Sequence, residues 1–323
     1  MNRNFKKFVY LLLFSGLFIL MLCNPQQSMH YAAAGLEIWF RNMIPALFPF
    51  MIVSGLLVRM GLATSIASLF SFFLNPILKV RPPLLYTVFM GFLCGFPMGA
   101  RITKEFYERK EINQKEAQWL LAFCNNLGPA YVCGTILPLL QRQTVWPYVL
   151  GLYGIPMLYG MVLRYTGFRD SVPKTETKEK PLLQSEAQAK DSASLILHLD
   201  DAVNQAVGSI LMLGGYMILF QVLQILPEQI LCFSSDFGEK TAAMLSPVIE
   251  ISGGITRIGA QMPLWCLMIL PSGGLCCMAQ TYGVLKGSGL SLKNYTLHKG
   301  ILTLLHFGYY LIWYLIRPET FLR

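Results

Sequence analysis

The sequence is poor in charged residues and lacks the motifs of several enzyme classes. Only 13% of its 323 residues are charged, about half the share found in soluble domains. It contains no P-loop and no dinucleotide-binding glycine motif. Its eight cysteines include no Cys-x-x-Cys pair, and its four histidines share no metal-ligand spacing with them. These absences argue against an enzyme, so we expect no catalytic residues, no cofactor and no metal.

Apolar residues take the place of the missing charge. They make up 54% of the chain and occur in continuous runs, whereas the strands of a membrane barrel would alternate apolar and polar positions. The pattern predicts an all-α polytopic membrane protein that lies in the lipid bilayer. The net charge of +9 is then assigned to lysines and arginines of cytoplasmic loops, and no nucleic acid is expected as a partner. The sequence leaves a homo-oligomer open.

The apolar runs predict seven full spans and two shorter, broken segments that re-enter and leave on the same side. Residues 31–42 are expected at the membrane interface, with Trp39 and Arg41 as anchors, and residues 102–116 are expected to form a charged helix in water or at the interface. The predicted spans are Phe8–Cys23, Ile44–Leu62, Ala117–Leu140, Trp146–Leu163, Val207–Leu226, Met262–Leu285 and Ile301–Ile316.

The distribution of lysine and arginine predicts the orientation. If the N-terminus is inside, the cytoplasmic segments hold 19 of these residues and the outer segments hold 5. Positive residues accumulate on the cytoplasmic side of membrane proteins. We therefore expect an inside N-terminus and an outside C-terminus.

The interruptions of the apolar sequence follow the same order twice. The first series contains "GFPMGAR" (95–101) and "NNLGP" (125–129), and the second contains "ISGGITR" (251–257) and "PSGG" (271–274). With the predicted orientation, the two series start on opposite sides of the membrane. The sequence therefore predicts an inverted-repeat transporter with two re-entrant helical hairpins.

This repeat divides the chain into four parts. The predicted parts are an N-terminal transmembrane helix (1–30), a first repeat (31–164), a cytoplasmic polar linker (165–192) and a second, inverted repeat (193–323).

Broken helices inside a membrane point to a binding site, because unpaired backbone is tolerated there only where protein or water covers it. An alternative is that the glycines of the first break form a small-residue packing face. Asn125 and Asn126 could equally join two helices, Arg101 could anchor at the surface, and Gln280 could be a packing contact. Glu250 could couple transport to a proton or cation, or neutralise an arginine. The candidate substrate-binding residues are Gly95, Pro97, Gly99, Arg101, Asn125, Asn126, Glu250, Ser252, Gly253, Arg257 and Gln280.

Four segments carry a family resemblance. "LFPFMIVSGLL" (47–57), "GFLCGFPMGAR" (91–101), "FCNNLGP" (123–129) and "VIEISGGI" (248–255) resemble the sporulation integral membrane protein family, which carries paired nucleoside-recognition (Gate) domains. The resemblance implies an architecture similar to that of concentrative nucleoside transporters. Leu127 departs from the family pattern, which has a small polar residue after the asparagines.

The resemblance also implies a cargo and a location. The family is linked to movement of dipicolinate, a small organic anion, across the mother-cell-derived membrane around the forespore of sporulating Firmicutes. Such a bacterial membrane transporter is the leading expectation, with Arg101 and Arg257 as a clamp for two carboxylates. One alternative is a carrier of nucleosides or other small polar solutes on the same scaffold. Another is a membrane partner or regulatory protein that transports nothing.

Overall fold

The computed structural model describes residues 3–140, 145–168, 192–231 and 236–321. Within these ranges the regular secondary structure is entirely helical. Five helical segments of the described chain are long and apolar enough to cross a membrane: Pro25–Arg59, Trp146–Tyr165, Leu195–Ile230, Pro263–Leu285 and Leu292–Ile316. The expected all-α polytopic membrane protein is confirmed. Most of the predicted polar linker, 165–192, lies outside the described residues.

The helices of the first half precede residue 166. They are α1 (Arg3–Cys23), α2 (Pro25–Ile38), η1 (Trp39–Met43), α3 (Ile44–Arg59), α4 (Ala63–Leu78), α5 (Pro82–Cys94), α6 (Met98–Glu108), α7 (Gln114–Phe123), α8 (Pro129–Tyr131), η2 (Val132–Ile136), α9 (Leu137–Leu140), α10 (Trp146–Val149), η3 (Leu150–Gly154) and α11 (Ile155–Tyr165).

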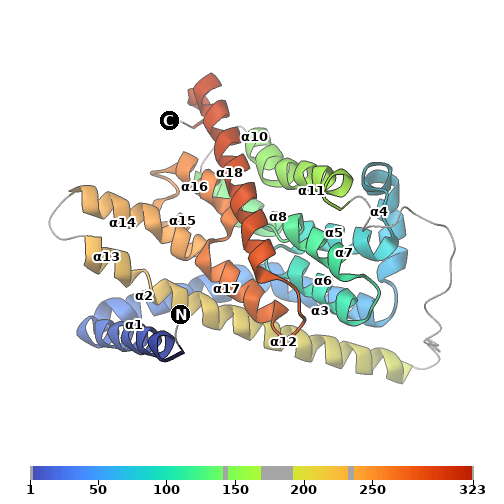
Figure 1. The fold of residues 1–323 in the computed structure, drawn as a ribbon, viewed down its shortest axis with the longest axis horizontal. Coiled ribbons are helices and arrows are strands. Elements are labelled where there is room, and N and C mark those ends of the chain that lie inside the picture. The colour runs from blue at the N-terminus through green and yellow to red at the C-terminus, as the bar shows by residue number, and fades with distance from the viewer. Residues whose placement is uncertain (1–2, 141–144, 169–191, 232–235, 322–323) are drawn as a thin grey trace.

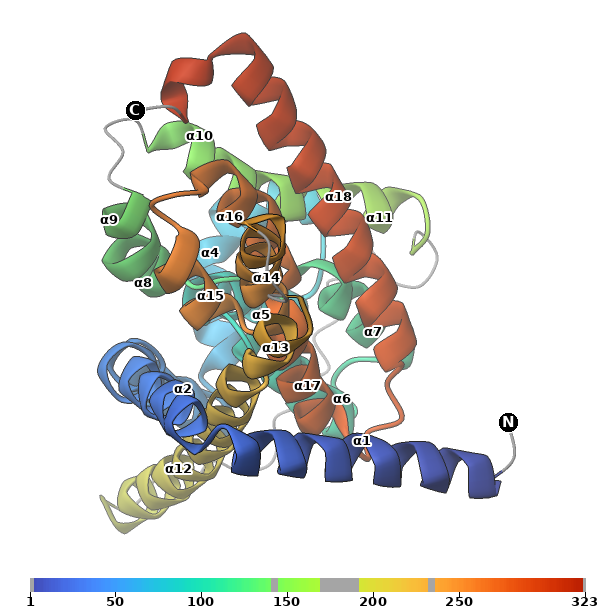
Figure 2. The same cartoon turned by 90° about the vertical axis from the view of Figure 1, so that its left-hand side faces the viewer.

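The helices of the second half begin at residue 192. They are α12 (Ser192–Val222), α13 (Ile225–Leu231), α14 (Asp236–Ile249), α15 (Ile251–Ile258), α16 (Pro263–Ile269), η4 (Leu270–Ser272), α17 (Gly274–Leu285), α18 (Leu292–Ile316) and η5 (Pro318–Thr320). The long helix α12 lies along α2 and α3, and α18 crosses the molecule as a single helix that packs on α7, α16 and η4 (Figure 1). Helix α1 extends away from this bundle (Figure 2).

Residues 31–42, predicted at the membrane interface, are helical. These residues belong to the continuous helical run Pro25–Arg59, in which the π-helical turn η1 joins α2 to α3. The indole Nε1 of Trp39 donates a hydrogen bond to the carbonyl oxygen of Ile210 on α12 (2.9 Å). Tertiary packing against α12 therefore determines the position of this segment.

The charged stretch 102–116 is two helix ends and a turn rather than one helix. Helix α6 ends at Glu108, and α7 begins at Gln114. Asn113 caps α7 by accepting a hydrogen bond from the backbone N–H of Glu116 (2.9 Å), and the Glu116 carboxylate accepts one from the backbone N–H of Asn113 (2.7 Å). This reciprocal capping box is a strong helix start signal, which explains the interruption.

Two hairpins and two broken helices meet inside the bundle. The first hairpin, α5–α6, turns at Gly95–Pro97, where the Phe96–Pro97 peptide is cis. It packs on the break between α7 and α8 so closely that a Cβ at Gly99 would lie 2.3 Å from the carbonyl oxygen of Cys124. The second hairpin, α14–α15, turns at Glu250 and packs on the break after η4, where a Cβ at Gly274 would lie 3.0 Å from the carbonyl oxygen of Pro247. The four interruptions therefore share one core.

We expect Gly99→Ala to lower the apparent Tm by about 5 °C, because an overpacked buried contact costs on the order of 1–3 kcal/mol. The added Cβ would collide with backbone at Cys124, which no side-chain rotation relieves. The control is Gly308→Ala on α18, where a Cβ meets nothing within 4 Å. Thermal unfolding of both purified variants is the measurement, and equal Tm values would contradict the close approach.

Candidate substrate site

An entry cavity of about 480 Å³ opens beside the first hairpin. Pro97 and Arg101 line it from α6 and the turn before it, Gln205 and Leu213 line it from α12, and Gln280 lines it from α17. Its volume lies within the range of about 300–1,000 Å³ that is usual for sites of small molecules. The cavity is thus large enough for a compact organic ligand.

Arg101 supplies the buried positive charge of the entry cavity. Its residue is 9% exposed, and its Nη1 atom is buried with no hydrogen-bond partner among the described residues. A guanidinium presents a planar set of N–H donors that suits a carboxylate. A buried donor without a partner is costly, so a ligand carboxylate that reached this atom would satisfy it.

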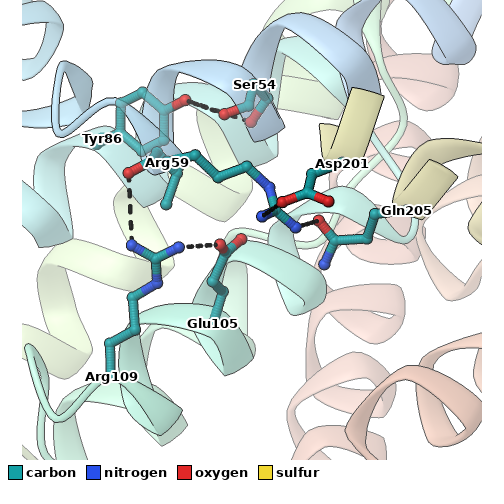
Figure 3. Close-up of polar contacts among 8 residues, drawn as sticks. Ser54, Arg59, Tyr86, Glu105, Arg109, Asp201 and Gln205 are labelled. Atoms are coloured by element: carbon teal, nitrogen blue, oxygen red, sulfur yellow. Dashed lines mark hydrogen bonds and ion pairs between the residues drawn. The ribbon is translucent and has the colours of Figure 1, made fainter. Parts of the chain in front are cut away.

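Arg59 and Arg109 are paired with carboxylates (Figure 3). Arg59 at the end of α3 bonds to Asp201 (3.0 Å) and Gln205 (3.3 Å) on α12. Arg109 bonds to Glu105 on α6 (2.9 Å), and it donates a further hydrogen bond to the backbone carbonyl of α3 at residue 58 (3.4 Å). These contacts tie α3, α6 and α12 together, and Arg59 and Arg109 differ from Arg101 in having carboxylate partners among the described residues.

A deep cavity of about 40 Å³ continues from the entry cavity. Leu213 and Gln280 line both cavities. The amide nitrogen of Gln280 donates to the thiol of Cys276 (3.2 Å), which is a weak acceptor. The deep cavity holds only a few waters, at about 10–15 Å³ each. A ligand of the size of an aromatic ring therefore fits the entry cavity and is too large for the deep cavity.

Glu250 forms the far wall of the deep cavity and caps α15. Its residue is 1% exposed. Its carboxylate accepts hydrogen bonds from the backbone N–H groups of Ser252 (3.1 Å) and Gly253 (2.7 Å), and from the side-chain amide of Gln221 (2.6 Å). A negative group at a helix N-terminus is stabilised by the helix dipole. Glu250 is thus fully engaged by donors of its own hairpin and of α12.

Three side chains donate hydrogen bonds one to the next, and this relay ends at the Glu250 carboxylate. The hydroxyl of Ser246 donates to Gln224, Gln224 donates to Gln221 (2.8 Å), and Gln221 donates to Glu250. A carboxylate is an acceptor only, which suits the end of such a relay. The relay joins α12, the following turn and both arms of the second hairpin.

The asparagines of the first break lie behind the cavities rather than on their walls. The Asn125 side chain donates to Thr281 on α17 (3.1 Å) and to Tyr295 on α18 (3.1 Å). The Asn126 amide donates to the carbonyl oxygen of Phe123, and its oxygen lies 3.3 Å from the ammonium of Lys299. Both asparagines are buried, so they connect the break to neighbouring helices, which was the alternative interpretation of these residues.

Arg257 lies apart from the site. It forms an ion pair with Glu228 on α13 and donates to the hydroxyl of Tyr31 on α2 (2.9 Å). Its side chain is 42% exposed, and it lines a separate cavity of about 330 Å³ with Tyr31 and Gln224. The structure therefore does not bring Arg257 and Arg101 together, and the two-arginine clamp expected from the repeat is not formed.

Of the five remaining candidate residues, two line a cavity and three are packed against other parts of the chain. Pro97 lines the entry cavity and Ser252 lines the deep cavity. Gly95 and Gly99 are packed against the backbone of the first break, as the packing alternative proposed. Gly253 belongs to the cap of α15 and lies against Gln221, where a Cβ would be 1.6 Å from the amide nitrogen.

Lys299 is the main residue that sequence reasoning missed. Lys299 is one of the 19 lysines and arginines assigned to the cytoplasmic side, yet it is 0% exposed and touches the breaks of both halves. Without Lys299 the cytoplasmic side still holds more lysines and arginines than the outer side. A signal for its burial exists in the sequence, because the buried residues of α18 recur every three or four positions. They are Tyr295, Lys299, Leu302, His306 and Tyr310.

These features define an integral membrane protein built of helices, with broken helices around a buried polar site. The chain is 27% identical over 303 residues to the sporulation integral membrane protein YlbJ of Bacillus subtilis (strain 168), a match that covers 85% of this chain and 74% of YlbJ. The expected resemblance to sporulation integral membrane proteins is thereby confirmed. No family model matches the chain. No solved structure matches it.

Proposed function

We propose that the protein is a secondary transporter that moves a small organic anion, dipicolinate in particular, across a membrane during sporulation. The observation that carries the proposal is the buried Nη1 atom of Arg101, which has no partner among the described residues and belongs to a side chain that lines a cavity of about 480 Å³. Dipicolinate is a rigid ring with two carboxylates. One carboxylate would pair with the Arg101 fork, and the amide of Gln280 would meet the other end.

The order of elements supports an inverted repeat of the Gate-domain type. A long helix is followed by a hairpin, a broken helix and a final span in each half. In the first half these are α2–α3, α5–α6, α7–α9 and α10–α11, and in the second half they are α12, α14–α15, α16–α17 and α18. Transporters with such repeats bind substrate where the discontinuous helices meet. The lining of the deep cavity by Phe96, Leu127 and Glu250 supports this proposal.

The cavities favour a state that is open toward the charged end of α6. The entry cavity reaches Lys104, Glu105 and Glu108, whereas the deep cavity beyond Gln280 is narrow. The charge bias of the sequence assigns the open side to the cytoplasm. Alternating access would then require the second hairpin to move away from α12 and α2.

We expect the linker before the second half and the C-terminal end of that half to lie on opposite sides of the membrane. Single cysteines would replace Ser185 in the linker and Glu319 after α18, in a background without Cys23, Cys133 and Cys232. A membrane-impermeant thiol reagent should then label the two positions from opposite sides. Labelling from the same side would contradict the inverted arrangement.

Equilibrium binding tests the proposed cargo. Purified protein is titrated with dipicolinate, with uridine and with benzoate, which carries a single carboxylate. A ligand that binds only the folded state raises the apparent Tm. The proposal predicts that dipicolinate raises it most, benzoate less and uridine not at all. A rise with uridine alone would favour the nucleoside alternative, and no response to any of the three would favour a partner that transports nothing.

A further inference from the structure

Lys299 joins three of the helix interruptions through one ammonium group. Its Nζ atom donates to the backbone carbonyl of Asn125 and lies 3.3 Å from Oδ1 of Asn126, both in the break after α7. It lies 3.5 Å from the carbonyl oxygen of Pro271 in η4. The ring of Phe96, at the tip of the first hairpin, faces it with its centroid 4.5 Å from Nζ.

Every one of these partners is neutral. No ion pair among the described residues includes Lys299, although the residue is 0% exposed. Burial of an ammonium group without a carboxylate is expensive, and charged groups at membrane depth are by default functional. Fold stability alone therefore does not explain a lysine at this position.

The oxygens around Nζ have the character of a monovalent cation site. Asn125 lies two residues after the last residue of α7, Phe123, and Pro271 belongs to the short helix that ends at the second break. Carbonyl groups at helix C-termini carry partial negative charge, and such ends of broken helices coordinate cations in transporters. An aromatic ring adds cation–π attraction. The site thus offers carbonyl and amide oxygens and a ring face, all suited to a single positive charge.

We propose that the two breaks form a monovalent cation site and that the Lys299 ammonium fills it permanently. The protein then carries its own cation in place of a bound metal ion. Together with the proposed transport function, this predicts that uptake is the same in sodium chloride and in choline chloride. The cation site itself can be tested without any transport measurement.

The test removes the tethered cation and supplies a free one. Lys299→Ala leaves a space with the oxygens still in place, so methylammonium should bind there and raise the apparent Tm of the variant by about 3 °C or more. Tetramethylammonium has no N–H donor and is too large, so it should have no effect. Wild type and Lys293→Ala, a change at an exposed lysine of the same helix, should respond equally and weakly to both salts.

The outcome is decisive even if Lys299→Ala folds poorly. Extraction in methylammonium should then yield a monodisperse peak in size-exclusion chromatography, and extraction in tetramethylammonium should not. Lack of any difference between the two salts, in Tm or in recovery, would overturn the cation site. Because no dipicolinate is present, this result is independent of whether the proposed cargo is correct.

Discussion

Arg101→Ala is expected to weaken dipicolinate binding by a factor on the order of 10²–10³. The Arg101 guanidinium lines the entry cavity, and its Nη1 atom has no partner there among the described residues. Loss of one partner of a buried charge pair costs about 3–5 kcal/mol, and each 1.4 kcal/mol is a factor of about ten. Arg101→Lys keeps the charge and loses the planar fork, so it should restore only part of the affinity. Isothermal titration of the purified variants measures these differences.

Two arginines serve as controls for this prediction. Arg41→Ala removes a guanidinium that is 74% exposed and paired with Glu37 on the surface, where such pairs contribute little. Arg257→Ala removes the arginine that pairs with Glu228 in a separate cavity. Both variants should keep the affinity of the wild type. If Arg257→Ala weakened binding as much as Arg101→Ala, the two-arginine clamp would be correct and the assignment to Arg101 alone would fail.

Glu250→Gln should lower dipicolinate uptake about tenfold or more and reduce the apparent Tm by about 5 °C. Both carboxylate oxygens of Glu250 accept hydrogen bonds, from Ser252, Gly253 and Gln221. The glutamine amide would place an N–H₂ group against one of these donors, and an unsatisfied buried donor costs about 1–3 kcal/mol. A change of about 1.4 kcal/mol in the free energy of the packed hairpin would change the equilibrium between its packed and unpacked conformations about tenfold.

Glu239→Gln provides the matched control, since Glu239 is an exposed carboxylate on the same hairpin. It should leave both uptake and Tm unchanged. Uptake and Tm are to be measured on the same preparations, so that loss of folded protein is separated from loss of transport. Wild-type uptake and stability in Glu250→Gln would show that the cap has no role in the transport cycle.

The sequence predicted the interruptions well because their causes are local. Pro97 removes a backbone donor, and Asn125 to Gly128 and Glu250 to Gly254 place polar or flexible residues inside apolar runs. The structure has helix ends at each of these positions. Local chemistry of this kind is independent of the partner helices, so it can be read from one segment alone.

The pairings across the bundle could not be predicted in the same way. Arg101 and Arg257 follow matching breaks, yet Arg257 pairs with Glu228, which belongs to a short helix with no marked signal in the sequence. Lys299 follows a polar stretch that is typical of a cytoplasmic loop, and its burial depends on the close packing of α18 on α7 and η4. The partner of Arg257 and the burial of Lys299 are both determined by tertiary contacts between residues far apart in the chain.

Uptake of radiolabelled dipicolinate into proteoliposomes tests the account most directly. Wild type should show saturable uptake above empty liposomes, Arg101→Ala should lose it at concentrations that saturate the wild type, and Arg257→Ala should retain it. Unlabelled dipicolinate should compete, and uridine should not. Folded wild-type protein that takes up no dipicolinate, or equal uptake by wild type and Arg101→Ala, would contradict the proposed transporter and its site.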